Sequence, residues 1–109
     1  MLKPIPLHIL IALADGDRHG YAVMQAIREQ SGGEVRVQTA SFYRHLAMLI
    51  NEGLVAESAS RRDGDDPRRG TYYRITPRGR QVLAAEKQRL LDLVSQMKKI
   101  RLSPRKADA

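Results

Sequence analysis

Apolar residues recur at intervals of three and four positions through the first half of the chain, which is the spacing of amphipathic helices. One such run covers residues 2–13, and the Asp-Gly-Asp sequence at 15–17 then signals a turn. A second run at 19–30 predicts another helix, which the Ser-Gly-Gly sequence at 31–33 ends. The side chains expected to face inward from this second helix are Tyr21, Val23, Met24 and Ile27.

A third helix is predicted from Thr39 to about Glu52, with Thr39 as its N-cap and Gly53 after its end. Its apolar side chains follow one stripe, made of Phe42, Leu46, Leu49 and Ile50. This stripe is expected to pack into the domain, which leaves the opposite face to solvent or to a partner. The side chains of that opposite face are Ser41, Arg44, His45, Met48 and Asn51.

After the third helix the pattern changes to the alternation of β-strands. Residues 54–58 and 71–76 predict the two strands of a hairpin, joined by a polar loop rich in Arg, Asp and Gly at 61–70. Alternation divides the side chains of the second strand between two faces, Tyr73 with Ile75 and Tyr72 with Arg74.

A fourth helix is predicted from Thr76-Pro77 to about Arg101, because Thr is a good N-cap and Pro suits the first helical position. Its apolar face is broader than so small a domain can bury, so we expect it to pack against the same helix of a second subunit. The residues expected at this dimer interface are Leu83, Leu90, Leu93, Val94, Met97 and Ile100.

This order of elements predicts a mainly α fold with a small β-hairpin, namely a winged helix-turn-helix plus a long C-terminal helix. We divide the chain into a winged helix-turn-helix DNA-binding domain at 1–76, a C-terminal dimerisation helix at 77–102 and a flexible basic tail at 103–109. A helix-turn-helix places its recognition helix in the major groove of DNA, which here is the third helix.

The chain of 109 residues has a net charge of +7, which favours a polyanionic partner. The excess is uneven, since residues 1–38 carry no net charge and most of the surplus lies at 71–80 and 98–109. Charge alone therefore points to the base of the wing and to the C-terminal end rather than to the third helix.

Composition and motifs argue against other classes of protein. Cysteine is absent, and no nucleophile elbow, Walker loop or dinucleotide fingerprint is present, so neither an enzyme nor a cofactor is expected. His8, His19 and His45 lack the spacing of a metal site, and His19 is expected to cap or buttress the second helix. Without a signal peptide or a long apolar run, we expect a soluble cytoplasmic protein with no membrane partner.

The candidate DNA contacts fall into two groups. On the third helix they are Thr39, Ser41, Tyr43, Arg44, His45 and Met48, and on the wing they are Arg61, Arg62, Arg68 and Arg69, with Arg74 near its base. The competing interpretations are a solvated helix face and a solvated loop, in which the three wing carboxylates would repel phosphates. Tyr43 could pack under its helix or donate its hydroxyl to a phosphate, and we favour the phosphate.

Several short sequences together resemble the PadR-type transcriptional regulators, of the short kind with one C-terminal helix. They are His-Gly-Tyr at 19–21, Ser-Gly-Gly at 31–33, Phe42-Tyr43 with Leu46 and Leu49, Glu-Gly-Leu-Val at 52–55, Arg69, Tyr-Tyr-Arg-Ile-Thr at 72–76 and Gly79-Arg80. The resemblance covers roughly residues 5–95. It implies a homodimeric repressor that binds a near-palindromic double-stranded DNA operator and dimerises through its terminal helix.

One departure from the family concerns the start of the third helix. The family usually has Gly-Thr-Leu-Tyr-Pro there, whereas this chain has Ala-Ser-Phe-Tyr-Arg at 40–44. Arg44 thus adds a positive charge on the expected DNA face, and we expect a different operator sequence.

Two alternatives stay open at this stage. A winged helix can serve as a protein–protein interaction adaptor, which would show no sequence preference and little salt dependence toward DNA. An unknown small-molecule effector could also bind between subunits, although the few aromatic residues give it no support.

Overall fold

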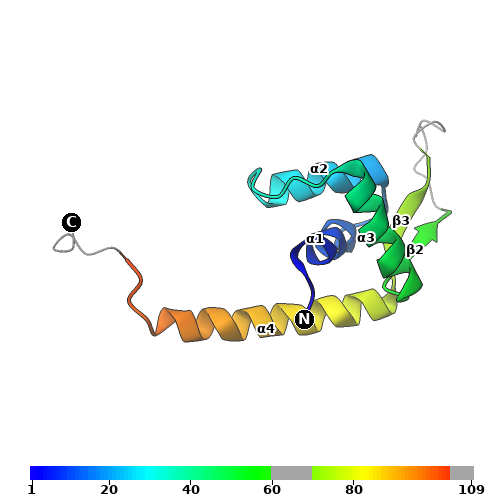
Figure 1. Ribbon diagram of the computed structural model, residues 1–109. Helices are drawn as coiled ribbons and strands as arrows, with labels where there is room; N and C mark the ends of the chain where they lie inside the picture. The colour runs from blue at the N-terminus through cyan, green and yellow to red at the C-terminus, as the bar shows by residue number, and fades with distance from the viewer. Residues whose placement is uncertain (60–69, 104–109) are drawn as a thin grey trace.

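The computed structural model describes residues 1–59 and 70–103 and has the expected order of elements. The helices are α1 (Pro4–Ala14), α2 (Gly20–Gln30), α3 (Thr39–Asn51) and α4 (Pro77–Lys98), and the strands are β1 (Arg18–His19), β2 (Val55–Ser58) and β3 (Tyr72–Ile75) (Figure 1). The fold class predicted from the sequence, a winged helix-turn-helix with a long C-terminal helix, is confirmed. The wing arginines and most of the tail at 103–109 lie outside the described residues.

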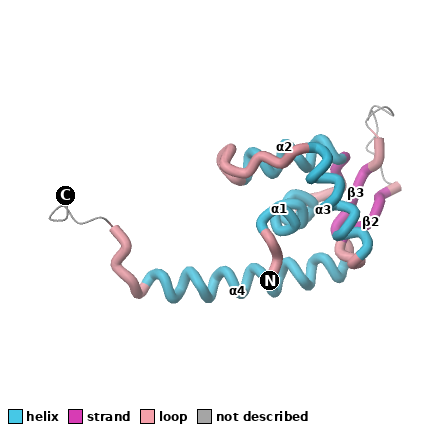
Figure 2. Tube along the Cα trace, viewed as in Figure 1, coloured by secondary structure: helices cyan, strands magenta, loops and turns pink. Residues whose placement is uncertain are grey.

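The three strands form one antiparallel sheet in the order β1-β3-β2 (Figure 2). In this sheet β3 is the central strand, with Ser58 of β2 opposite Tyr72 on one side and His19 of β1 opposite it on the other. The sequence did not predict β1, because a two-residue strand is too short to show alternation.

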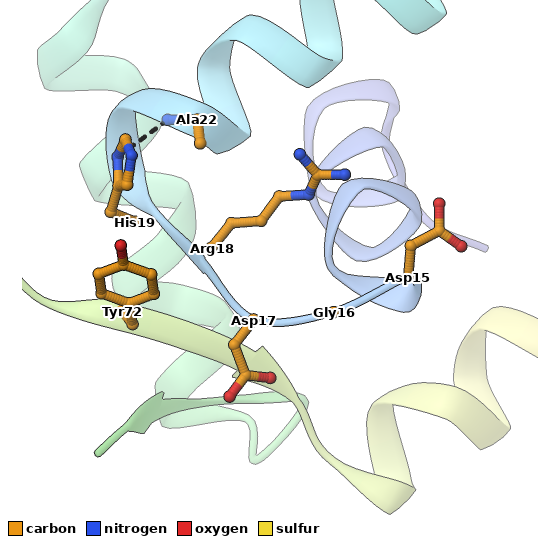
Figure 3. Close-up of a pocket in the computed structure, with 7 residues that line it drawn as sticks. All are labelled: Asp15, Gly16, Asp17, Arg18, His19, Ala22 and Tyr72. Atoms are coloured by element: carbon orange, nitrogen blue, oxygen red, sulfur yellow. Dashed lines mark hydrogen bonds between the residues drawn. The ribbon is translucent and has the colours of Figure 1, made fainter. Parts of the chain in front are cut away.

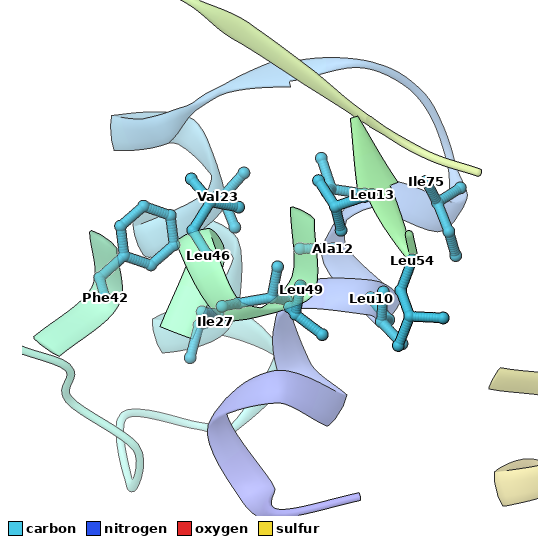
Figure 4. Close-up of a cluster of buried hydrophobic side chains, with 12 residues drawn as sticks. Leu10, Ala12, Leu13, Val23, Ile27, Phe42, Leu46, Leu49, Leu54 and Ile75 are labelled. Carbon is cyan, nitrogen blue, oxygen red and sulfur yellow. The ribbon is translucent and has the colours of Figure 1, made fainter. Parts of the chain in front are cut away.

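The hydrophobic core lies between α1, α2, α3 and the sheet (Figure 4). Its buried side chains include Ile9, Leu10 and Leu13 of α1, Val23 and Ile27 of α2, and Phe42, Leu46 and Leu49 of α3. Burial of each large side chain contributes about 1.5–3 kcal/mol, so these converging stripes are the main source of stability. They also hold α3 firmly by one face.

Two expectations about individual side chains, those for Tyr21 and Ile50, were wrong, and the burial of Tyr72 was not anticipated. Tyr21 is 65% exposed, because it lies on the side of α2 opposite Val23. Ile50 is 37% exposed, at the edge of the α3 stripe. Tyr72 is buried although it shares a face with exposed Arg74, because the His19 ring meets it edge-on at a centroid distance of 5.5 Å.

The helix ends follow the predicted chemistry except at α3. The Thr76 hydroxyl accepts a hydrogen bond from the Gly79 N–H at 3.0 Å, which confirms Thr76 as the N-cap of α4. The His19 Nδ1 accepts from the Ala22 N–H at 3.2 Å, so His19 caps α2 as expected. Thr39 is not an N-cap, because α3 begins one residue earlier than expected, with Gln38 at that position.

The long α4 gives the molecule its elongated shape. It packs its first half against α1 and β3 and then projects beyond the domain (Figure 1). The radius of gyration is 17.0 Å, whereas a compact chain of this length would have about 13 Å. The helix ends at Lys98, three residues before the predicted Arg101. Within residues 1–59 and 70–103, every helix is too short or too polar to cross a bilayer.

Candidate nucleic-acid interface

The outer face of α3 is accessible to solvent. Thr39, Arg44 and Met48 are exposed, and Ser41 and His45 are partly exposed. The His45 Nδ1 lies 2.8 Å from the Ser41 carbonyl oxygen, which requires the Nδ1–H tautomer and ties the ring to its own helix. Ser41, Arg44 and Met48 therefore share the outer face of α3, and His45 lies at its edge. Thr39, in the first turn, lies on another side of the helix.

The start of α3 has no side-chain cap. Gln38 makes no capping hydrogen bond, the first turn holds no acidic residue, and the first intrahelical bond runs from the Phe42 N–H to the Gln38 carbonyl. The N–H groups before Phe42 therefore point out of the helix at its positive end, where an anion is stabilised.

Tyr43 joins α3 to the start of α2. Its ring packs edge-to-face on Phe42 at a centroid distance of 5.0 Å, and its hydroxyl lies so close to Gly20 that a Cβ there would collide with it. The side chain is still 44% exposed. Packing and phosphate contact are thus compatible for Tyr43, and its contact with DNA stays a prediction.

The base of the wing adds two cations. Arg74 on β3 and Arg78 in the first turn of α4 are both exposed. Tyr73 on β3 is partly buried, and this burial raises the pKa of its phenol. The nearby Tyr43 and Glu57 raise that pKa further, so Tyr73 is a neutral hydrogen-bonding group at physiological pH. The four wing arginines (Arg61, Arg62, Arg68 and Arg69) lie outside the described residues, so their role also stays a prediction.

The turn after α1 forms a polar pocket of about 230 Å³ that includes Asp17, Arg18 and His19 (Figure 3). Its polar groups are engaged within the fold, since the Ser58 hydroxyl donates to Asp17 and the Arg18 Nε donates to the Ala12 carbonyl at 2.9 Å. No three potential metal ligands are grouped in the described part of the chain. The pocket lies where the end of α1 meets β1 and the rest of the sheet.

Two arginines outside the predicted set of DNA contacts lie near the start of α3. Arg28 on α2 and Arg36 in the connector before α3 are exposed and line one cleft. Sequence reasoning missed them because the charges of residues 1–38 cancel in the sum. A usable signal was present, since Tyr21, Gln25 and Arg28 are spaced along one helical face opposite Val23 and Ile27.

The expected dimerisation residues form a separate, apolar surface. Leu90, Leu93, Val94, Met97 and Ile100 are between 37% and 58% exposed, while Leu83 packs partly on the core. A groove of about 400 Å³ between α1 and α4 continues this surface toward Leu7 and Ile11. So much exposed apolar surface on a short chain is typical of an interaction site.

A buried carboxylate fixes α4 to the beginning of the chain. Glu86 is only 5% exposed, and its Oε2 accepts from the Leu2 backbone N–H at 2.9 Å. The Arg89 guanidinium contacts its other oxygen. The Leu2 hydrogen bond, and then Arg89, hold the pKa of Glu86 below its ordinary value.

The fold and this surface define a winged-helix protein with a projecting C-terminal helix. The sequence profile of the transcriptional regulator PadR-like family matches residues 9–85, so the chain belongs to this family. This confirms the resemblance seen in the sequence. Because the family consists of transcriptional regulators, it also confirms the expectation that the chain is not an enzyme.

Solved structures share this fold. A PadR family transcription regulator from Clostridium difficile superposes with a TM-score of 0.73 at 22% identity, covering 89% of this chain and 97% of that one. The PadR of Bacillus subtilis, in complex with operator DNA, gives a TM-score of 0.61 at 21% identity, covering 94% of this chain and 50% of that one. At these identities the likeness concerns the fold.

One curated relative is 38% identical over 78 residues, which make up 72% of this chain and 20% of the relative. It is an uncharacterized 37.1 kDa protein in transposon TN4556 of Streptomyces fradiae. The chain thus spans one fifth of the length of this relative.

Proposed function

We propose that this protein is a homodimeric, sequence-specific repressor that binds a double-stranded DNA operator. The observation that carries the proposal is the two-faced α3, whose apolar stripe is buried while its outer face presents Arg44 and an uncapped start. Membership of a family of transcriptional regulators supports it. So does the fold shared with the Bacillus subtilis protein that is in complex with operator DNA.

In this mechanism the exposed half of α3 enters the major groove. Arg44 reads a base edge, for which guanine O6 and N7 are the usual acceptors of arginine. The free N–H groups at the start of α3 and the Tyr43 hydroxyl face phosphates. Arg74, Arg78 and the wing arginines neutralise the flanking backbone, which adds affinity without reading sequence.

The second subunit covers the apolar surface of α4. Residues 91–98 are all exposed, and the end of α4 projects beyond the winged domain, so a partner related by a two-fold axis can place its own domain over them. The groove between α1 and α4 is then part of the interface. Repression then follows from occupancy of an operator that overlaps a promoter.

Selection of bound duplexes from a random pool, followed by gel shifts across a salt series, tests the proposal. We expect the selected duplexes to share an inverted repeat, to bind far more tightly than unrelated duplexes, and to lose affinity steeply with salt. A protein–protein adaptor would select no common sequence and would respond little to salt. That result would contradict the proposed function.

A further inference from the structure

An open cleft of about 280 Å³ lies between α2 and the connector at 31–38. Its rim carries Tyr21, Gln25, Arg28 and Arg36, and Val35 and Val37 contribute apolar surface. Among residues 1–59 and 70–103, no carboxylate lines it, although Glu29 and Glu34 are close in sequence. The cleft therefore combines two positive charges with neutral hydrogen-bonding groups, which is the chemistry of a site for an anion.

The two guanidinium groups are exposed and unengaged. Within the described residues neither Arg28 nor Arg36 forms an ion pair or a side-chain hydrogen bond. The Tyr21 hydroxyl accepts from the Gln25 Nε2 at 3.3 Å, which leaves its own proton for another acceptor. Arg28 is in the last turn of α2, where a positive charge stabilises the helix end. The same role cannot explain the presence of Arg36, which lies in no helix.

The cleft lies on the predicted DNA-facing side of the molecule. α2, the connector and the beginning of α3 lie on the side away from α4, with α1 between them (Figure 1). The connector leads directly into Gln38 and the uncapped start of α3. An anion in the cleft would therefore lie next to whatever α3 binds.

We propose that this cleft receives a backbone phosphate of the same DNA whose bases α3 reads. The inference rests on the proposed function and adds a contact that fixes the register of α3 on the duplex. Two guanidinium groups can hold one phosphate in paired hydrogen bonds, and the first helix of a helix-turn-helix crosses the backbone. Such a contact positions the protein and carries no sequence information.

The test compares the wild type with the single variants Arg28→Gln and Arg36→Gln and with the double variant. Affinity for a selected duplex and for an unrelated duplex is measured from about 50 to 200 mM salt. We expect the double variant to weaken both duplexes by the same factor and to lower the salt slope by about 0.9, the value for one phosphate. Because one guanidinium can still neutralise the shared phosphate, each single variant should keep most of this slope, and the full loss should appear only in the double variant.

Lys3→Gln is the control, because it removes an exposed positive charge near the N-terminus, which lies beside α4 and away from the cleft (Figure 1). Its salt slope should equal that of the wild type. Thermal denaturation should change little in all variants, since the substituted side chains are exposed and only Arg28 stabilises a helix end.

An unchanged slope in the double variant, with wild-type binding intact, would overturn the cleft proposal alone. A loss confined to the selected duplex would also overturn it, because it would indicate base contact. If inorganic phosphate shifted the NMR signals of both arginines while the slope stayed unchanged, the cleft would be a site for a free anion. Failure of the wild type to bind any duplex would instead overturn the proposed function.

Discussion

Gly79 shows how one residue holds α4 against the sheet. A Cβ at this position would collide with the Leu54 carbonyl oxygen and would lie 2.8 Å from Ile75 Cγ1. The absence of a side chain lets the first turn of α4 pack directly on the chain that enters β2. The Leu54 carbonyl also accepts a hydrogen bond from the Thr76 N–H at 3.1 Å. Neither this carbonyl group nor the first turn of α4 can therefore move easily away from the other.

Gly79→Ala is predicted to destabilise the fold. Helix propensity alone would favour Ala by about 1 kcal/mol, but the collision with a fixed backbone atom should reverse the sign and cost about 1–3 kcal/mol. Urea denaturation measures the free energy of unfolding. Gly20→Ala is the control, because a Cβ there meets the end of the half-exposed Tyr43 side chain, which can turn away. A more stable Gly79→Ala variant would contradict the packing described here.

Arg44 should carry base preference. Arg44→Ala is expected to weaken binding to selected duplexes and to relax preference at one base pair by about 1–3 kcal/mol. Gel shifts with single-base variants of the duplex measure both effects. Asn51→Ala, at the exposed end of the same helix, should change neither. If preference were unchanged in Arg44→Ala, another part of the protein would read the sequence.

At the scale of residues, the sequence predicts which face of a helix is buried better than it predicts the burial of a single side chain. The α3 stripe of Phe42, Leu46 and Leu49 was confirmed because one helical period specifies it. Tyr21 was assigned inward although it lies two residues from Val23, which puts the two on opposite sides of a helix. Tyr72 could not be predicted, because the His19 ring that covers it comes from a distant strand.

Among the elements, the four helices and the hairpin could be predicted and β1 could not. Helices and turns carry local signals, such as the Thr76-Pro77 start of α4. The pairing of β1 with β3 depends on contacts between residues more than fifty positions apart, which leave no local pattern. The link between Glu86 and Leu2 was missed for the same reason.

The Glu86 link makes the stability of the α4 packing dependent on pH. The pKa of Glu86 is lowered in the folded protein from an ordinary value of 4.5, so its stabilising effect is complete above that value. The effect is lost as the pH falls through the lower folded pKa. Glu86→Gln should therefore lower the free energy of unfolding at neutral pH, and the deficit should shrink in acid.

Chemical denaturation of wild type and Glu86→Gln between neutral pH and acid measures this difference. Glu52→Gln is the control, since Glu52 is exposed and has no side-chain partner in the described part of the chain. A deficit of Glu86→Gln that stayed constant with pH would show that the charge of Glu86 is not what matters.

The apolar face of α4 should decide the oligomeric state. Leu90→Asp places a charge at the centre of the exposed stripe and the groove, so it is expected to give a folded monomer that binds an inverted repeat weakly. Light scattering gives the mass and circular dichroism checks the helix. Gln81→Asp, at an exposed position on the opposite side of α4 from Leu90, should remain a dimer. A monomeric variant with wild-type operator affinity would refute the dimer as the binding unit.

At the scale of the whole molecule, the two proposed surfaces lie on different sides of the domain. The start of α3 and the arginine cleft face away from α4 (Figure 1). α4 has 22 residues, a length of about 33 Å. In a dimer, two winged domains at opposite ends of the paired α4 helices would present their α3 helices to one side of a duplex. The length of α4 is close to the separation of about 34–36 Å between half-sites one DNA turn apart.

This geometry predicts a strict dependence on half-site spacing. Inserting about five base pairs between the half-sites of a selected inverted repeat turns one of them by about half a turn, so one α3 would face away from its major groove. Affinity should then fall to that of a duplex with a single half-site, and the salt slope should fall with it, because half of the phosphate contacts are lost. Base changes within the same spacer at constant length are the control and should have a smaller effect. Equal affinity for the original and the lengthened repeat would mean that α4 does not hold the two domains at a fixed distance, and the link from its apolar face to operator recognition would fail.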